Sequence, residues 1–226
     1  MGVKCVFPFS RDPQALGEMK QRVERLRGKK VGDWSLFCTL YLHELAKEPS
    51  LPETISKELY LLREELFPSS SSSSSLEDDS APSSFSSSTN NKCYLMLQGN
   101  ILEAGLEMQS IIKKAKLYKP RQTVHIKGLQ YEIGDFGVKI GSIMLGNNNK
   151  GVVVEVEYRP CLTPNQCQGI LNEFIGNLGP FDVSIPRFLG TYVPFDGLVL
   201  PTLYSMRHTT SQYVRLCHAL KLLKPT

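Results

Sequence analysis

The alternation of apolar and polar residues is clearest between residues 131 and 161. On each side of a cluster of glycine and asparagine, these apolar residues all lie at even-numbered positions. They are Phe136, Val138, Ile140 and Met144 before the cluster, and Val152, Val154, Val156 and Tyr158 after it. Glu155, Glu157 and Arg159 take the intervening positions of the second half. Alternation of this kind is typical of strands with one apolar and one polar face, and the glycines and asparagines at 146–151 favour a tight reversal. The stretch therefore predicts a β-hairpin.

The same patterns predict further elements along the chain. Alternating residues indicate strands at 3–9, 34–42 and 93–98. Apolar residues at helical spacing, together with capping or terminating residues, indicate helices at 13–27, 51–66, 101–119, 164–178 and 209–223. In the strand that leads into the hairpin, the apolar residues lie at even-numbered positions before Gly128 and at odd-numbered positions after it. A β-bulge at Gly128 would produce that change.

Residues 68–92 have a different composition from the rest of the chain. Thirteen of these twenty-five residues are serine, and the acidic cluster Glu77, Asp78 and Asp79 lies among them. A segment so poor in apolar residues does not bury enough surface to offset the entropy lost on ordering. We expect a disordered insertion here, either a passive spacer or a site of phosphorylation at Ser74 or Ser75.

Length and composition predict one globular domain, 1–226, that contains this insertion. The 226 residues are 41% hydrophobic and 21% charged, and the net charge of +4 is too small to indicate nucleic-acid binding by itself. The six cysteines form no C-x-x-C pair and have no zinc-like spacing with the four histidines, which favours reduced thiols in the core of an intracellular protein. We expect no cofactor, no metal, no membrane span and no direct contact with nucleic acid.

The hairpin carries the one pattern that indicates possible chemistry. Glu155, Glu157 and Arg159 have the form ExExR, which is similar to the charged rows of triphosphate-tunnel metalloenzymes. Alternation places all three side chains on one face of a strand, where two carboxylates bind a divalent ion and the arginine a phosphate. Such an enzyme needs further charged rows, and the partner strand offers only Asp135 and Lys139 on its polar parity. A solvent-facing row is the commoner outcome, so we predict no catalytic residues and keep the metal-dependent triphosphatase as the alternative.

The hairpin also resembles a known family. Its pattern YxxxDFxVKxGxxxxG, then KG and VEVEYxPC, is similar to that of Mediator subunit 20, the TRF-proximal protein family of the RNA polymerase II coactivator. The matching residues are Tyr131, Asp135, Phe136, Val138, Lys139, Gly141, Gly146, Gly151, Val154, Glu155, Val156, Glu157, Tyr158, Pro160 and Cys161. The opening residues 1–6 and the closing helix resemble the family as well.

This resemblance implies both a fold and a function. The family's fold is a β-barrel with flanking helices, and the strand pattern agrees with an α+β protein whose largely antiparallel sheet is curled into a barrel and flanked by helices. The implied function is that of a non-catalytic scaffold in the head module of Mediator, in the nucleus. The implied partners are Mediator subunit 18, as a heterodimer, and subunit 8, with RNA polymerase II contacted indirectly.

Partner contacts are expected from two elements, the first arm of the hairpin and the terminal helix. The predicted partner-binding residues are Phe136, Val138, Ile140, Met144, Tyr213, Leu216 and Leu220. The pattern does not separate these residues from ordinary core. For the terminal helix as a whole, docking on the chain's own sheet is the expected arrangement.

Overall fold

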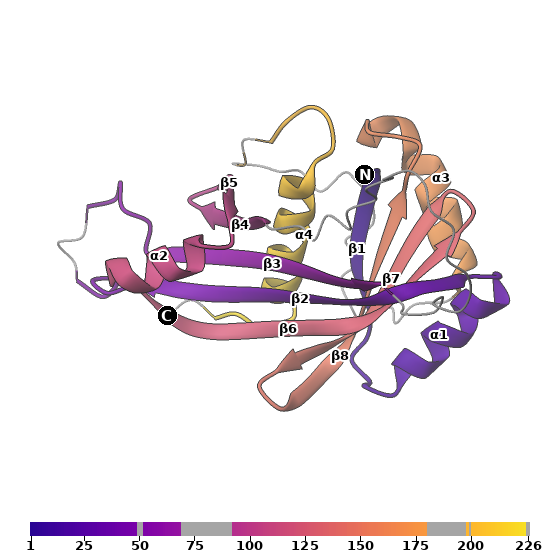
Figure 1. Cartoon of the computed structure of the whole chain (residues 1–226), viewed down its shortest axis with the longest axis horizontal. Helices are drawn as coiled ribbons and strands as arrows, with labels where there is room; N and C mark the ends of the chain where they lie inside the picture. Colours follow the sequence, from indigo (N-terminus) through magenta and orange to yellow (C-terminus); the bar gives the residue numbers. More distant parts are fainter. Residues whose placement is uncertain (49–51, 69–91, 180–197, 199, 225–226) are drawn as a thin grey trace, which may run out of the picture.

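Figure 1 shows the computed structural model, which describes residues 1–48, 52–68, 92–179, 198 and 200–224. The strands in this part of the chain are β1 (Val3–Ser10), β2 (Lys29–His43), β3 (Glu58–Pro68), β4 (Lys92–Leu97), β5 (Asn100–Gly105), β6 (Tyr118–Ile133), β7 (Phe136–Leu145) and β8 (Asn148–Tyr158). The helices are α1 (Ala15–Arg25), α2 (Met108–Ala115), α3 (Pro164–Asn177) and α4 (Met206–Ala219). None of these helices is long and apolar enough to cross a bilayer.

All eight strands form one antiparallel sheet in the order β1-β8-β7-β6-β2-β3-β4-β5. The α+β class and the antiparallel sheet are thus confirmed. The barrel is wrong, because β1 and β5 are edges that do not pair with each other. Helix α4 contacts β1, β4 and β5, so a helix bridges the two edges that a barrel would join.

The helices cover the two faces of the sheet unequally. On one face, α1 and α3 pack over β1, β7 and β8 at one end, and α2 packs over β3 and β4 at the other. On the opposite face, α4 packs over the middle of the sheet (Figure 1). The terminal helix therefore docks on its own sheet, as predicted.

Strand β6 shows why the apolar parity changes along one strand. Val124 and Ile126 are buried under α4, whereas Tyr131 is buried on the other face with α1. The strand passes from the cover of one helix to that of another, and its pairing with β7 runs without a shift through Gly128. The predicted bulge at Gly128 is therefore wrong. Glycine is needed there because a Cβ atom would lie 1.9 Å from the carbonyl oxygen of Ile140.

Two predicted helices are corrected by the structure. Residues 51–66 fall mostly in strand β3, which buries Leu59 and Leu61 on one face and Tyr60 and Leu62 on the other. Because both faces are covered, the apolar residues lose the alternation that identifies a half-exposed strand. The predicted helix 101–119 is strand β5 followed by the shorter helix α2 and the start of β6.

The other predicted elements are confirmed, with ends that differ by a few residues. These are the strands at 3–9, 34–42 and 93–98, the hairpin of β7 and β8, and the helices at 13–27, 164–178 and 209–223. The hairpin turns more tightly than predicted, since Leu145 pairs with Asn148. None of the six cysteines, all of which lie in the described part of the chain, forms a disulfide, and all except Cys161 are buried. The predicted insertion, including Ser74 and Ser75, lies outside the described residues except for its ends in β3 and β4.

Candidate functional site

The charged row of β8 lies on the sheet face that α4 covers. Lys139 of β7 is directly opposite Glu155, and Lys4 of β1 is directly opposite Glu157. Glu64 of β3 reaches the same place from across the sheet, where it forms an ion pair with Lys139. Strands β1 and β3, which are distant in sequence, and the neighbouring strand β7 therefore bring their charges to β8, the second strand of the hairpin.

Glu155 is the centre of this buried cluster, with 2% of its surface exposed. Its Oε1 atom accepts a hydrogen bond from Lys4 Nζ at 2.9 Å and lies 3.5 Å from Lys139 Nζ. Its Oε2 atom accepts a hydrogen bond from the Tyr213 hydroxyl of α4 at 2.8 Å. Both oxygens of the carboxylate are thus occupied by groups of this chain.

The cluster shifts the pKa values of Glu155 and Lys4 in the directions that keep both side chains charged. Burial opposes ionisation of Glu155, but Lys139 and Lys4 outweigh it and lower the pKa of Glu155 from 4.5 to about 2. Burial likewise opposes the charge of Lys4, but Glu155, followed by Glu64 and Glu157, raises the pKa of Lys4 above its ordinary 10.5. Glu155 is therefore an anion held by cations, without the raised pKa of a general acid.

The same helix closes the edge of the sheet beside the cluster. The Gln212 amide of α4 donates to the carbonyl oxygen of Lys4 at 3.0 Å and accepts from the backbone N–H of Val6 at 2.7 Å. Gln212 also donates to the hydroxyl of Tyr204 at 3.0 Å. A side-chain amide thus makes with β1 the two hydrogen bonds that a neighbouring strand would make.

The remaining two members of the row point to other partners. Glu157 accepts a hydrogen bond from the backbone N–H of Gly2 at 2.5 Å. Arg159 is exposed and forms an ion pair of 2.6 Å with Glu132 at the end of β6. The prediction of a solvent-facing row is therefore wrong for Glu155 and holds for Arg159. Within the described ranges, no three His, Cys, Asp or Glu side chains are placed to hold a metal ion.

Sequence reasoning found Glu155 and missed what surrounds it. The contributions of Lys4, Glu64 and Tyr213 depend on the strand order β1-β8-β7-β6-β2-β3, which no local pattern specifies. One signal was available, because Lys4 interrupts an apolar run that is buried on both faces. A lone lysine within such a run is buried only at high cost unless an acid pairs with it.

The predicted partner-binding residues differ in their access to solvent. Val138, Ile140, Tyr213 and Leu216 have 0% of their surface exposed, within the chain's own core. A partner that meets the chain as folded here does not touch them. Phe136, Met144 and Leu220 are part-exposed. For these three residues the contact role stays a prediction.

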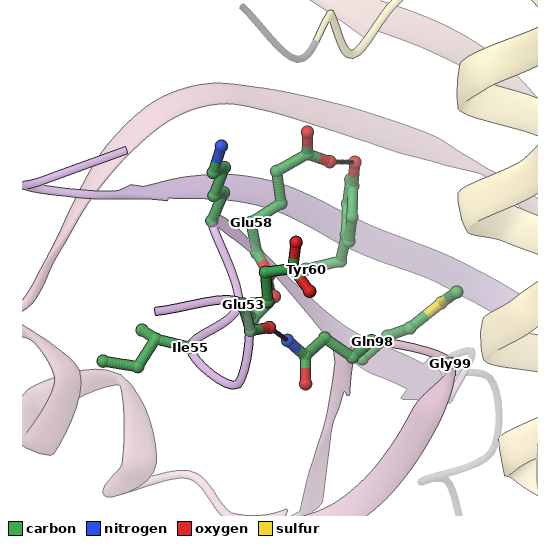
Figure 2. A pocket seen from close by; sticks show the side chains of 9 residues that line it. Glu53, Ile55, Glu58, Tyr60, Gln98 and Gly99 are labelled. Carbon is green, nitrogen blue, oxygen red and sulfur yellow. Dashed lines mark hydrogen bonds between the residues drawn. The ribbon is translucent and has the colours of Figure 1, made fainter. Parts of the chain in front are cut away.

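A separate hollow of about 430 Å³ lies where the segment before β3 meets the turn between β4 and β5 (Figure 2). Gln98 donates from its Nε2 atom to the backbone oxygen of Glu53 at 3.0 Å, and the Tyr60 hydroxyl donates to the carboxylate of Glu58. Ile55 is 39% exposed beside them. Because Glu58 is already engaged, the hollow offers an apolar notch with a polar rim and no set of reactive groups.

A family model and the sequences of curated relatives indicate the same family for this chain. Residues 1–218 match the family model described as TATA-binding related factor (TRF) of subunit 20 of Mediator complex. The chain is 26% identical over 237 residues to Mediator of RNA polymerase II transcription subunit 20 of Xenopus laevis, an alignment that covers 98% of this chain and 95% of the relative. It is 46% identical to the Anopheles gambiae subunit 20 over 69 residues, 30% of this chain and 32% of that relative.

A solved structure titled as the Schizosaccharomyces pombe Mediator head module also resembles the chain. The TM-score is 0.34 at 15% identity, with 68% of this chain and 80% of that chain covered. A likeness this weak bears on neither the fold nor the function.

Proposed function

This chain belongs to the Mediator subunit 20 family, and we propose that it works as a non-catalytic, protein-binding subunit of the Mediator coactivator of RNA polymerase II. Its mechanism is binding to other Mediator subunits in the nucleus. The match to the family model, which spans residues 1–218, supports membership over nearly the whole chain. The relatives from Xenopus laevis and Anopheles gambiae are both Mediator subunits by name.

One observation in the molecule carries the non-catalytic part of the proposal. Glu155, the residue best placed for chemistry, has its two oxygens engaged by Lys4 and Tyr213 beneath α4. A carboxylate used for metal binding or proton transfer needs an oxygen that a substrate or an ion reaches. The charges of the row instead fix α4 and β1 to the rest of the sheet.

The partners follow from the family resemblance. Subunit 18, as a heterodimer, and subunit 8, which links the pair to the rest of the head module, are the proposed neighbours.

A pull-down from nuclear extract tests the proposal. The tagged full chain is expressed at its natural level, and the co-purifying chains are identified by mass spectrometry. We expect several Mediator subunits, with subunits 18 and 8 among them at near-equal amounts to this chain. Recovery of this chain without Mediator subunits would contradict the proposal, and recovery of Mediator without subunits 18 and 8 would contradict only the choice of neighbours.

A further inference from the structure

An uncovered strip crosses the sheet face that carries α1 at one end and α2 at the other. We call this the open strip and define it by Phe37, Arg63, Phe67, His125 and Lys127. Phe37 of β2 lies directly opposite Arg63 of β3 on one side and His125 of β6 on the other. Among the described elements, none packs over these residues, and Figure 1 shows the middle of β2, β3 and β6 running between the two helices.

The strip contains a hollow of about 640 Å³ whose lining includes two stacked rings. The Phe37 ring stacks on the His125 ring with centroids 4.2 Å apart and planes at 5°, and the Arg63 guanidinium lies 4.9 Å from the same ring on its other side. Leu129 and Leu16 line the hollow towards α1. An ordered, partly apolar floor of this kind binds a partner at little entropic cost.

Phe67 projects beside the hollow with 51% of its surface exposed. A phenylalanine buries a large apolar area, so leaving half of it in water forgoes roughly 1 kcal/mol of stabilisation by transfer values. Elsewhere on this face, α1 and α2 cover the apolar residues of the sheet. Phe67 is thus an apolar anchor without a covering element among the described residues.

The charged side chains around the hollow leave one positive charge without an acidic partner among the described residues. The two acids that line the hollow are already paired, Asp33 with Lys30 at 2.9 Å and Glu65 with Arg63 at 3.0 Å. Lys127 is exposed and forms no ion pair with any described residue. Burial, with Lys127 close by, lowers the pKa of His125, so that ring is neutral near pH 7. A partner therefore meets one unpaired positive charge next to an apolar hollow.

A helix fits this surface better than an extended segment or a second copy of the chain. A strand laid on a sheet face leaves its backbone N–H and C=O groups unpaired, whereas a helix pairs them internally. Two copies related by a two-fold axis would place the same positively charged strip against itself, without a counter-charge for Lys127.

We propose that the open strip binds an acidic amphipathic helix of another Mediator subunit, an inference that rests on the proposed function. Apolar side chains of that helix enter the hollow against Phe67, and a carboxylate of the helix pairs with Lys127.

Photo-crosslinking in the assembled complex tests this proposal. Phe67 is replaced by p-benzoyl-phenylalanine in the tagged full chain, and the purified Mediator is irradiated and digested. The matched control carries the same group at Leu102 of β5, which is 54% exposed and lies outside the open strip. We expect position 67 to form an adduct with a peptide of another Mediator subunit that has acidic and apolar residues at helical spacing. Position 102 should give at least tenfold less of that adduct.

A charge reversal then tests the specific contact. Lys127→Glu is expected to reduce the adduct at least threefold and to leave the urea midpoint of the isolated chain unchanged, because Lys127 forms no ion pair with the residues that the structure describes. Replacing the facing acid of the cross-linked peptide by lysine should restore the adduct in the Lys127→Glu background. A general disturbance of the surface would not be rescued in this way.

The outcomes separate this inference from the proposed function. Three outcomes would contradict the proposed role of the open strip and leave the proposed function unaffected. They are an adduct with a second copy of the chain or with RNA, an adduct whose yield does not change in Lys127→Glu, and no adduct although Mediator subunits still co-purify. If the unmodified chain recovers no Mediator subunits, both proposals fail together.

Discussion

The two faces of strand β8 hold the molecule together in different ways. Val152, Val154 and Val156 meet α1 and α3 through apolar contacts alone, whereas Val153 and Glu155 meet α4 with an ion cluster and hydrogen bonds beside the apolar contacts. Apolar contacts are not directional, but the hydrogen bonds of Glu155 require α4 in one position. The comparison indicates that the apolar face mainly supplies stability and the charged face mainly fixes the position of the terminal helix.

The largest expected effect comes from removing the centre of the cluster. Glu155→Ala leaves Lys4 and Lys139 buried without a full counter-charge, and we expect it to lower the free energy of unfolding by about 3–5 kcal/mol. Val154→Ala, one residue away on the apolar face and equally buried, is expected to cost about 2 kcal/mol. Urea denaturation of the two variants measures both. Equal losses of unfolding free energy in the two variants would contradict the expectation that the buried ion cluster is more sensitive to truncation than the apolar face.

Acid should remove the contribution of Glu155 without any mutation. The folded state lowers the pKa of Glu155 to about 2, so its contribution is complete above its ordinary value of 4.5 and is lost as the pH falls towards 2. The size of that shift corresponds to roughly 3 kcal/mol. Unfolding free energies measured from pH 6 to pH 2 check this. The wild type should lose that amount more than Glu155→Gln, and parallel pH profiles would contradict the expectation.

Removing the hydrogen bonds of Gln212 should have a smaller and more local effect. Gln212→Ala leaves the N–H of Val6 and the C=O of Lys4 without partners, which costs about 2 kcal/mol. Hydrogen exchange should accelerate at the amide of Val6 more than at that of Val154, because Val154 lies in a strand paired on both sides. Equal acceleration at both amides would mean that Gln212 acts only on global stability.

Sequence patterns predicted most of the strands, including β1 and β7, which are buried on both faces, but assigned β3 and β5 to helices. In β3, Tyr60 and Leu62 pack under α4 while Leu59 and Leu61 pack with α2, so four consecutive positions are apolar and do not alternate. The family resemblance identified the antiparallel sheet but also implied a closed barrel. Whether β1 meets β5 is decided by α4, whose Gln212 occupies the edge of β1.

The candidate site was predicted in its residues and not in its environment. The positions of Glu155 and Glu157 on one face follow from alternation, which is a local property of a strand. The environment of Glu155 comes from Lys4 and Tyr213, which are separated from it by 151 and 58 residues. Contacts of that kind depend on strand order and helix docking, which no short window of sequence contains.

The smallest expected effect lies at the outer end of the same charged row. Arg159 pairs with Glu132 at 2.6 Å, but both side chains are more than a third exposed, at 38% and 42%. Water and salt screen such a pair, so Arg159→Ala should change the free energy of unfolding by less than about 1 kcal/mol, and less again at high salt. Urea denaturation at low and high ionic strength measures this beside Glu155→Ala. Arg159 and Glu155 are only four positions apart in one row. Comparable losses of unfolding free energy in Arg159→Ala and Glu155→Ala would mean that burial under α4 does not determine how much a charged side chain of this row contributes to stability.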